Sequence, residues 1–370
     1  MSAVLEDQFI RCFKFDHQEK NLCVGTRNGL RNIKFSNPLE LRCQAKLYGV
    51  EVYLLELMPG TNVIAYVTDE ERNRLCFCNF RGELYVHEPM YYARPIVRVK
   101  GSKERVMVVV EDTIFIYNNI ENLKLINEIS LSGIISETIV DLSEHPVNSY
   151  VAYPKFDKVG HFILDDSGAP SNNKNKIIQA HDSPLVAITF DPNGRTVASA
   201  SEHGILIKVH RAFNGECVYE FKRGVTLNIT ITSLSFSKDA KFLCANDTTN
   251  NLKIYKLDYS ASIVNTGSSW FRERFQSLAE SILPENASKL LFDENPFARA
   301  KLPESSACKS MCTIYRDEKG ISHLLVVNTD GLVYTYSMDA ANGGQCELLK
   351  SFSIAANRYV ENAADTWVMV

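Results

Sequence analysis

Two adjacent cations, Lys222 and Arg223, are the residues whose type and spacing best fit a binding function in this chain. They follow Phe221 and precede Gly224, at the end of an alternating apolar segment that is typical of a strand. Consecutive side chains of a strand leave on opposite faces, so the two cations cannot easily serve one small pocket together. The pair therefore predicts two anion sites, one on either side of the chain.

Motifs of catalysis and metal binding are absent from the sequence. It contains no Gly-x-Ser-x-Gly, His-Glu-x-x-His, P-loop or Gly-x-Gly-x-x-Gly motif. His181, Asp182 and Ser183 are triad residue types, but triads assemble from distant positions, so we interpret His181 as a turn or core hydrogen-bonding group. The ten cysteines form no Cys-x-x-Cys pair and no zinc-type cluster. We expect no enzyme, no metal and no cofactor.

Composition and charge set the broad class. The chain has 370 residues, 45% of them hydrophobic, which is enough for a large core. Its formal net charge of −4 argues against nucleic-acid binding. The N-terminus lacks the basic and apolar regions of a signal peptide, and the apolar runs 106–110 and 324–327 are far shorter than a membrane span. We therefore expect a cytoplasmic protein that meets membranes only from their surface.

The elements that must position the two cations belong to a repeat. Its pattern is a phenylalanine, a polar turn, an apolar strand, a second turn and another apolar strand, and it begins at Phe190 and again at Phe236, 46 residues later. In a third copy, Phe15 and Gly29 both precede their counterparts, Phe190 and Gly204, by 175 residues. Weaker copies cover 52–80, 96–117, 139–164 and 311–336.

Seven units of about four strands predict an all-β fold, a seven-bladed β-propeller of the WD-repeat type. The propeller would occupy 1–370 as a single domain, because no linker-like break interrupts the chain. A β-sandwich or two β domains with chance similarity is the alternative. The sequence leaves open whether the N-terminal strand closes the ring by pairing into the last blade.

One segment does not fit the repeat. Between 259 and 303 the blade pattern stops, which predicts a long, partly helical insertion in blade six with an amphipathic segment at 268–283. The apolar side chains of one helical face are Trp270, Phe271, Phe275, Leu278 and Ile282. This face either packs on the propeller or binds a membrane interface or a partner.

The motif Phe221-Lys222-Arg223-Gly224 lies between a His-x-Ser-Pro-Leu blade and a Ser-Leu-x-Phe-Ser blade. In this context it resembles the PROPPIN family, the phosphoinositide-binding propellers called WIPI proteins in animals, whose hallmark is Phe/Leu-Arg-Arg-Gly. The opening blade at 15–35 and the segments 297–303, 328–331 and 343–350 also match. The resemblance implies two headgroup pockets at the rim, flanking blades five and six, with the blade-six insertion as the membrane anchor.

Carried over by position, the resemblance assigns headgroup binding to Lys222, Arg223 and Gly224 of the motif and to further residues in two pockets. The first would use Lys222 with Ser199, Ser201 and Lys208, and the second Arg223 with Asn246, Asn251 and Lys253. Cations suit phosphate charge, and hydroxyl and amide groups suit phosphate and inositol oxygens. For the hydroxyl and amide side chains, ordinary hydrogen bonding in turns is the alternative.

This chain departs from the family pattern at several positions. Lys222 replaces the first arginine, which keeps the charge but loses the bidentate fork. Asp247 stands where relatives have a hydroxyl residue, and its carboxylate would repel a phosphate unless it faces away. Asn251 and Lys253 stand where the family generally has threonine and histidine. The second pocket is therefore expected to be the weaker one.

The resemblance implies that the protein binds phosphatidylinositol 3-phosphate and phosphatidylinositol 3,5-bisphosphate and recruits autophagy proteins for autophagosome formation. It would be monomeric in solution and recruited peripherally to preautophagosomal and endosomal membranes. Its protein partners would be the autophagy conjugation machinery and lipid-transfer proteins. The alternative function is a propeller adaptor that acts through protein partners with little lipid binding.

A basic stretch at 94–105 could contact such partners. It contains Arg94, Arg98, Lys100, Lys103 and Arg105. The other interpretation is a solvated strand face.

Overall fold

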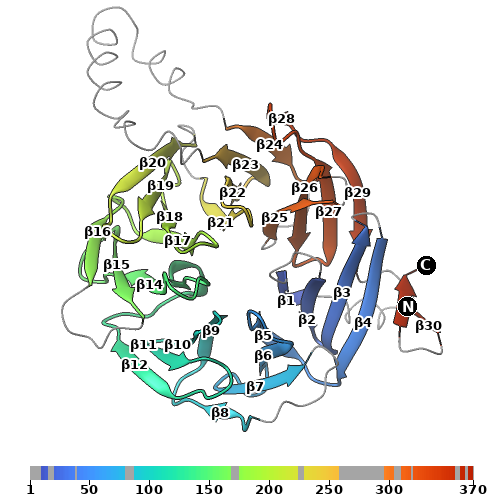
Figure 1. The fold of residues 1–370 in the computed structure, drawn as a ribbon, viewed down its shortest axis with the longest axis horizontal. Helices are drawn as coiled ribbons and strands as arrows, with labels where there is room; N and C mark the ends of the chain where they lie inside the picture. The colour runs from blue at the N-terminus through green and yellow to red at the C-terminus, as the bar shows by residue number, and fades with distance from the viewer. Residues whose placement is uncertain are drawn as a thin grey trace, which may run out of the picture.

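The computed structural model describes residues 10–15, 21–37, 40–79, 87–167, 175–223, 229–257, 296–303, 310–317, 320–354, 359–362 and 366–369. Their strands form seven sheets that follow one another around a ring (Figure 1). Each sheet contains one blade, built from four antiparallel strands in chain order. The seven-bladed β-propeller predicted from the repeats is confirmed, and the four weaker copies correspond to blades two, three, four and seven.

Blades one to three contain the following strands. Blade one has β1 (Ile10–Phe15), β2 (Asn21–Thr26), β3 (Gly29–Asn37) and β4 (Glu40–Tyr48); blade two has β5 (Val52–Leu57), β6 (Val63–Thr68), β7 (Arg74–Asn79) and β8 (Met90–Tyr91); blade three has β9 (Ile96–Gly101), β10 (Arg105–Val110), β11 (Thr113–Asn118) and β12 (Leu125–Ser130). A short 3₁₀ helix, η2 (Glu137–Ile139), precedes blade four.

Blades four to seven continue the series. Blade four has β13 (Asp141–Leu142), β14 (Tyr150–Pro154), β15 (His161–Asp166) and β16 (Lys176–Gln179); blade five has β17 (Leu185–Phe190), β18 (Thr196–Ser201), β19 (Leu206–Arg211) and β20 (Cys217–Lys222); blade six has β21 (Ile231–Phe236), β22 (Phe242–Asp247), β23 (Asn251–Lys256) and β24 (Ala298–Lys301); blade seven has β25 (Ser310–Arg316), β26 (Ser322–Asn328), β27 (Leu332–Ser337) and β29 (Leu348–Ser353).

The burial pattern follows the position of a strand within its blade. Every residue of β18 and of β22 is buried, because neighbouring blades cover both faces of these second strands. The outermost strand β12 alternates between exposed and half-buried residues, since only one of its faces has a neighbour. The position of a strand in its blade therefore decides its burial more than its apolar content, since β18 is buried throughout although it contains Thr196, Ser199 and Ser201.

Ring closure uses packing between whole blades. β1 pairs with β2 of its own blade, and blade seven is complete with four strands from the C-terminal part of the chain. Ile10, Leu22 and Val24 of blade one pack with Val327 and Val333 of blade seven in one buried cluster. The question that the sequence left open is therefore answered: β1 does not pair into the last blade.

Three short strands extend this pattern. β28 (Gly344–Gln345) runs parallel to β24 of blade six, and β31 (Thr366–Met369) pairs with the outer strand β4 of blade one. β30 (Tyr359–Asn362) pairs in turn with β31 and lies outside β4 in Figure 1.

Polar contacts cross from blade to blade near the inner strands. Lys14 Nζ lies 3.0 Å from Glu56 Oε2, which links blades one and two. Arg98 donates to Asp141 Oδ1 at 2.9 Å, and the amide of Phe190 donates to the other oxygen of the same carboxylate at 2.9 Å. Asp141 therefore connects blades three, four and five.

The predicted insertion at 259–303 begins after β23 and extends past β24. Since β24 is the fourth strand of blade six, the range 259–303 includes a strand of the propeller at its C-terminal end. The amphipathic segment 268–283 lies outside the described residues. Within the described residues, no helix is long and apolar enough to cross a bilayer.

Candidate functional site

The two cations of the motif separate at the end of β20. Phe221 stacks on Tyr255 of blade six with ring centroids 4.5 Å apart, so its face of the strand is turned toward blade six. Lys222 follows on the opposite face, and Arg223 is again directed to blade six, where it contacts Asp247. The geometry therefore provides two separate positions for positive charge.

The first position is a face of blade five that we call the blade-five group. It consists of Ser199, Ser201, Lys208, Glu220 and Lys222. Ser199 pairs with Lys208 and Lys208 with Glu220 across three neighbouring strands, and Ser201 and Lys222 follow two residues further along their strands on the same face. Both serines are buried, whereas both lysines are half-buried. The structure thus brings together all four residues predicted for the first pocket.

Two contacts surround the polar side chains of the blade-five group, one within the group and one to His181. Lys208 Nζ lies 3.6 Å from Glu220 Oε2, and both side chains are partly exposed. His181 is buried, and its Nε2 lies 3.0 Å from the hydroxyl of Ser199. Burial, and then the nearby charge of Lys208, lowers the pKa of His181 to about 4. At neutral pH the ring is therefore uncharged and acts as a core hydrogen-bonding group, which agrees with the interpretation of its sequence context.

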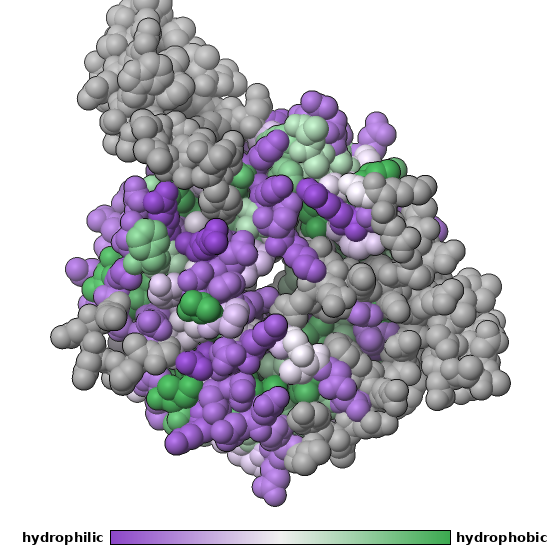
Figure 2. Space-filling model, viewed as in Figure 1, coloured by the Kyte–Doolittle hydropathy of each residue, from purple (hydrophilic) through white to green (hydrophobic). Residues whose placement is uncertain are grey.

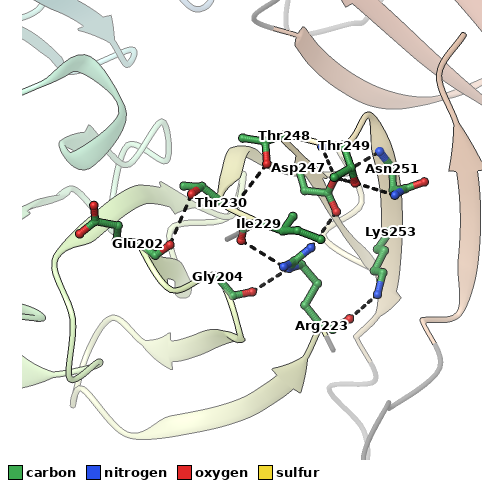
Figure 3. Close-up of polar contacts among 10 residues, drawn as sticks. All are labelled: Glu202, Gly204, Arg223, Ile229, Thr230, Asp247, Thr248, Thr249, Asn251 and Lys253. Carbon is green, nitrogen blue, oxygen red and sulfur yellow. Dashed lines mark hydrogen bonds and ion pairs between the residues drawn. The ribbon is translucent and has the colours of Figure 1, made fainter. Parts of the chain in front are cut away.

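The second position is occupied by the guanidinium of Arg223, which is only 4% exposed. Its Nε donates to the carbonyl of Gly204 at 2.7 Å, one terminal nitrogen donates to Asp247 Oδ2 at 2.8 Å, and the other donates to the carbonyl of Ile229 at 3.1 Å (Figure 3). Arg223 therefore connects the outer strand of blade five to the turn at Gly204 in its own blade and to Ile229 and Asp247 on the blade-six side.

Gly204 is required for this arrangement. Its φ is +60°, and a Cβ at this position would lie 2.3 Å from the carbonyl oxygen of Ile229. Any other residue would push apart the two carbonyl groups that receive the Arg223 guanidinium.

Asp247 faces Arg223 and also accepts hydrogen bonds from its own turn. Its Oδ1 accepts hydrogen bonds from the amide of Thr249 at 2.8 Å and from the amide of Asn251 at 3.3 Å, and also from the Thr249 hydroxyl. Lys253 Nζ donates to the backbone carbonyl of Arg223. The carboxylate that was expected to repel a phosphate is thus turned into the site, where it pairs with the cation.

Of the remaining predicted site residues, Asn251 lies beside the Arg223–Asp247 pair, whereas Asn246 does not. Asn251 shares the Asp247 turn and donates to the Thr249 hydroxyl at 2.7 Å. Asn246 is buried on the other face of β22, where its amide donates to Ser310 of blade seven, so the structure does not bring it to the Arg223 side. Gly224 and the insertion residues Trp270, Phe271, Phe275, Leu278 and Ile282 are outside the described residues.

The basic stretch at 94–105 is partly internal. Arg98 pairs with Asp141, and Lys100 Nζ lies 2.6 Å from Glu144 Oε1. Both cations lie on β9, the innermost strand of blade three, with side chains only 22% and 10% exposed. Neither a partner surface nor a solvated face describes these two residues, because both are mostly buried and paired with carboxylates. The sequence of β9 could not show this pairing, since the carboxylates come from the next blade.

The sequence model of the PROPPIN family matches residues 9–355. The chain belongs to the PROPPIN family. Among its relatives, the WD repeat domain phosphoinositide-interacting protein 1 of Xenopus laevis is 29% identical and covers 96% of this chain and 82% of its own length. Autophagy-related protein 18 of Caenorhabditis elegans is 25% identical, with 99% and 92% covered. The resemblance inferred from the motif is confirmed.

Solved structures share the fold of this PROPPIN. Hsv2 of Kluyveromyces lactis superposes with a TM-score of 0.71 at 18% identity, covering 94% of this chain and 99% of its own. Atg21 in a structure described as the complex of KlAtg21 with the coiled-coil of AgAtg16 has a TM-score of 0.67 at 21% identity, with 94% and 99% covered. No group of metal-binding side chains occurs among the residues that the structure describes.

Proposed function

We propose that this PROPPIN is a phosphoinositide effector. It binds phosphatidylinositol 3-phosphate and phosphatidylinositol 3,5-bisphosphate at the rim beside its Phe-Lys-Arg-Gly motif, and it recruits autophagy machinery for autophagosome formation. The observation that carries the proposal is the blade-five group, where Lys208 and Lys222 share one face with Ser199 and Ser201. Relatives named as phosphoinositide-interacting and autophagy-related proteins support it.

The blade-five group has suitable chemistry for a phosphorylated inositol. The two ammonium groups attract phosphate, and the serine hydroxyls can donate to phosphate or inositol oxygens. Glu220 is the opposing charge, but its pair with Lys208 is partly exposed, and such pairs contribute little stability. A phosphate can therefore replace Glu220 as the partner of Lys208. The second site, with Arg223, Asn251 and Lys253, contains Asp247, so we assign most of the headgroup affinity to the first.

Membrane attachment would combine the headgroup sites with the blade-six insertion. The segment that leaves β23 and returns at β24 starts and ends in the blade that contacts Arg223. On the face seen in Figure 2, the described surface is mainly hydrophilic, with hydrophobic residues in separate small patches. We therefore propose that the propeller contributes headgroup contacts and that the predicted apolar stripe of 268–283 contributes the insertion.

The second candidate function is an adaptor that acts through protein partners with little lipid binding. It is favoured by the complex of the structural neighbour Atg21 with an Atg16 coiled coil. We propose partners from the autophagy conjugation machinery and from lipid-transfer proteins, and a monomer in solution that is recruited to preautophagosomal and endosomal membranes. The two functions differ in whether vesicle binding depends on the blade-five group.

Replacement of Lys222 tests the proposal. Lys222→Thr removes one phosphate contact, which corresponds to about 1–2 kcal/mol or roughly tenfold in affinity. Flotation with phosphatidylcholine vesicles containing phosphatidylinositol 3-phosphate should fall accordingly, while vesicles with unphosphorylated phosphatidylinositol give the background. Lys124→Thr, at an exposed turn of blade three, removes the same charge elsewhere and should float like the wild type. A wild type that stays at background would favour the adaptor.

Replacement of Glu220 should have the opposite effect. Glu220→Gln removes the carboxylate beside Lys208 and keeps the size of the side chain. Binding to the same vesicles is expected to become a few times tighter, because phosphate no longer competes with an internal anion. Equal or weaker flotation of this variant would exclude Lys208 as a headgroup ligand.

A further inference from the structure

The second anion site of this chain already contains an anion. The positively charged and N–H groups beside the motif converge on the carboxylate of Asp247 (Figure 3). We propose, as an inference that rests on the proposed function, that the Asp247 carboxylate is an internal ligand of this site. It takes the place of a phosphate at Arg223 and limits the protein to one headgroup, which binds at the blade-five group.

The donor set around Asp247 is the one that a phosphate would need. One oxygen accepts from the Arg223 guanidinium at 2.8 Å, and the other accepts from the Thr249 amide at 2.8 Å and from the Thr249 hydroxyl. A guanidinium, backbone amides and a hydroxyl are common ligands of phosphate oxygens. Because one carboxylate receives all of them, these donors are not available to an external ligand in this state.

Burial makes the Asp247 carboxylate hard to displace. Arg223 and Asp247 side chains are each 4% exposed, and the other nitrogens of the guanidinium are bound to the carbonyl groups of Gly204 and Ile229. A headgroup would have to expel a fully hydrogen-bonded carboxylate and leave it without its cation. The ion pair is neutral as a whole, so it also attracts a phosphate far less than an unpaired arginine would.

The inference assigns different roles to the two cations of the motif. Lys222 acts on the lipid, whereas Arg223 acts as a cross-link between blades five and six. Position 247 therefore determines whether one or two headgroups bind.

The test uses the full chain and vesicles of phosphatidylcholine with or without phosphatidylinositol 3-phosphate. Asp247→Asn should increase flotation severalfold, and it should restore most of the binding that Lys222→Thr removes. Adding Arg223→Gln to the double variant should abolish the recovered binding. In the wild-type background, Arg223→Gln should leave most flotation intact but lower the melting temperature by several degrees.

Controls separate charge and folding effects from the proposed role. Asp239→Asn removes one carboxylate from another turn of blade six, where Asp239 pairs with Arg316 at 3.2 Å, and it should not change flotation. If Asp247→Asn is unstable, Asp247→Thr provides a second variant. The soluble headgroup inositol 1,3-bisphosphate should then raise the melting temperature of the folded variant more than that of the wild type.

The outcomes distinguish this inference from the proposed function. A wild type that does not bind the vesicles contradicts the proposed function itself. A wild type that binds, but loses as much flotation with Arg223→Gln as with Lys222→Thr at an unchanged melting temperature, contradicts only the role of Asp247. The role of Asp247 is also contradicted if folded Asp247→Asn and Asp247→Thr variants bind the vesicles no better than the wild type.

Discussion

Acidification from pH 7 to pH 5 is expected to destabilise the folded protein by about 2 kcal/mol for each of two buried histidines. Burial is the main cause that lowers the pKa of His181 and of His210 from 6.5 to about 4. Between pH 6.5 and about pH 4, the unfolded chain takes up a proton on each of these rings and the folded protein does not. Stability is therefore lost as the pH falls through this window.

Chemical denaturation at pH 7 and pH 5 measures this effect. Burial raises the pKa of Asp165 and of Asp191, so protonation of these carboxyl groups at lower pH favours the folded state. This effect reduces the loss of stability that the two histidines cause. The contribution of each histidine is isolated by His181→Gln and His210→Gln, because the packing lost in a variant cancels when its two pH values are compared. His203→Gln, at an exposed position, controls for the loss of a ring. Unchanged pH dependence in both buried variants would contradict the prediction.

Gly160→Ala is expected to destabilise the protein by roughly 3 kcal/mol or more. Gly160 has a φ of +69°, and a Cβ there would lie 1.8 Å from the carbonyl oxygen of His181. The carbonyl of Gly160 also accepts the backbone N–H of His181 at 3.0 Å, so the turn cannot move without moving His181. Since His181 contacts Ser199, the variant should also weaken vesicle binding at the blade-five group.

A second glycine provides the control for this prediction. Gly320 has a similar φ of +78°, but a Cβ at this position would meet no atom within 4 Å. Gly320→Ala should therefore show only the cost of the left-handed backbone, about 1 kcal/mol, and normal vesicle binding. Thermal unfolding of both variants compares the two costs. Equal melting temperatures of the two variants would contradict the prediction, because they would show that the close contact between the new Cβ and the His181 carbonyl oxygen costs no stability.

The positions of the predicted pocket residues show what local strand alternation can place. Ser199, Ser201, Lys208 and Lys222 come from three neighbouring strands of one blade, so local alternation and register are sufficient to place them on one face. By the same rule Asn246 lies on the other face of β22, because it is adjacent to Asp247, and its side chain points to blade seven. A family pattern carried over by position does not report this difference in direction.

The fold could be predicted from the amino-acid sequence, because each blade is a local unit whose strands, turns and repeat length can be read along the chain. The divergence of Lys222 and Arg223 could also be predicted, since it depends only on the alternation of an extended backbone. The groups that each cation contacts became visible only in the folded protein. The partners of Arg223 lie in turns around Gly204, Ile229 and Asp247, and a contact between separate blades depends on how whole sheets pack, which no local pattern encodes.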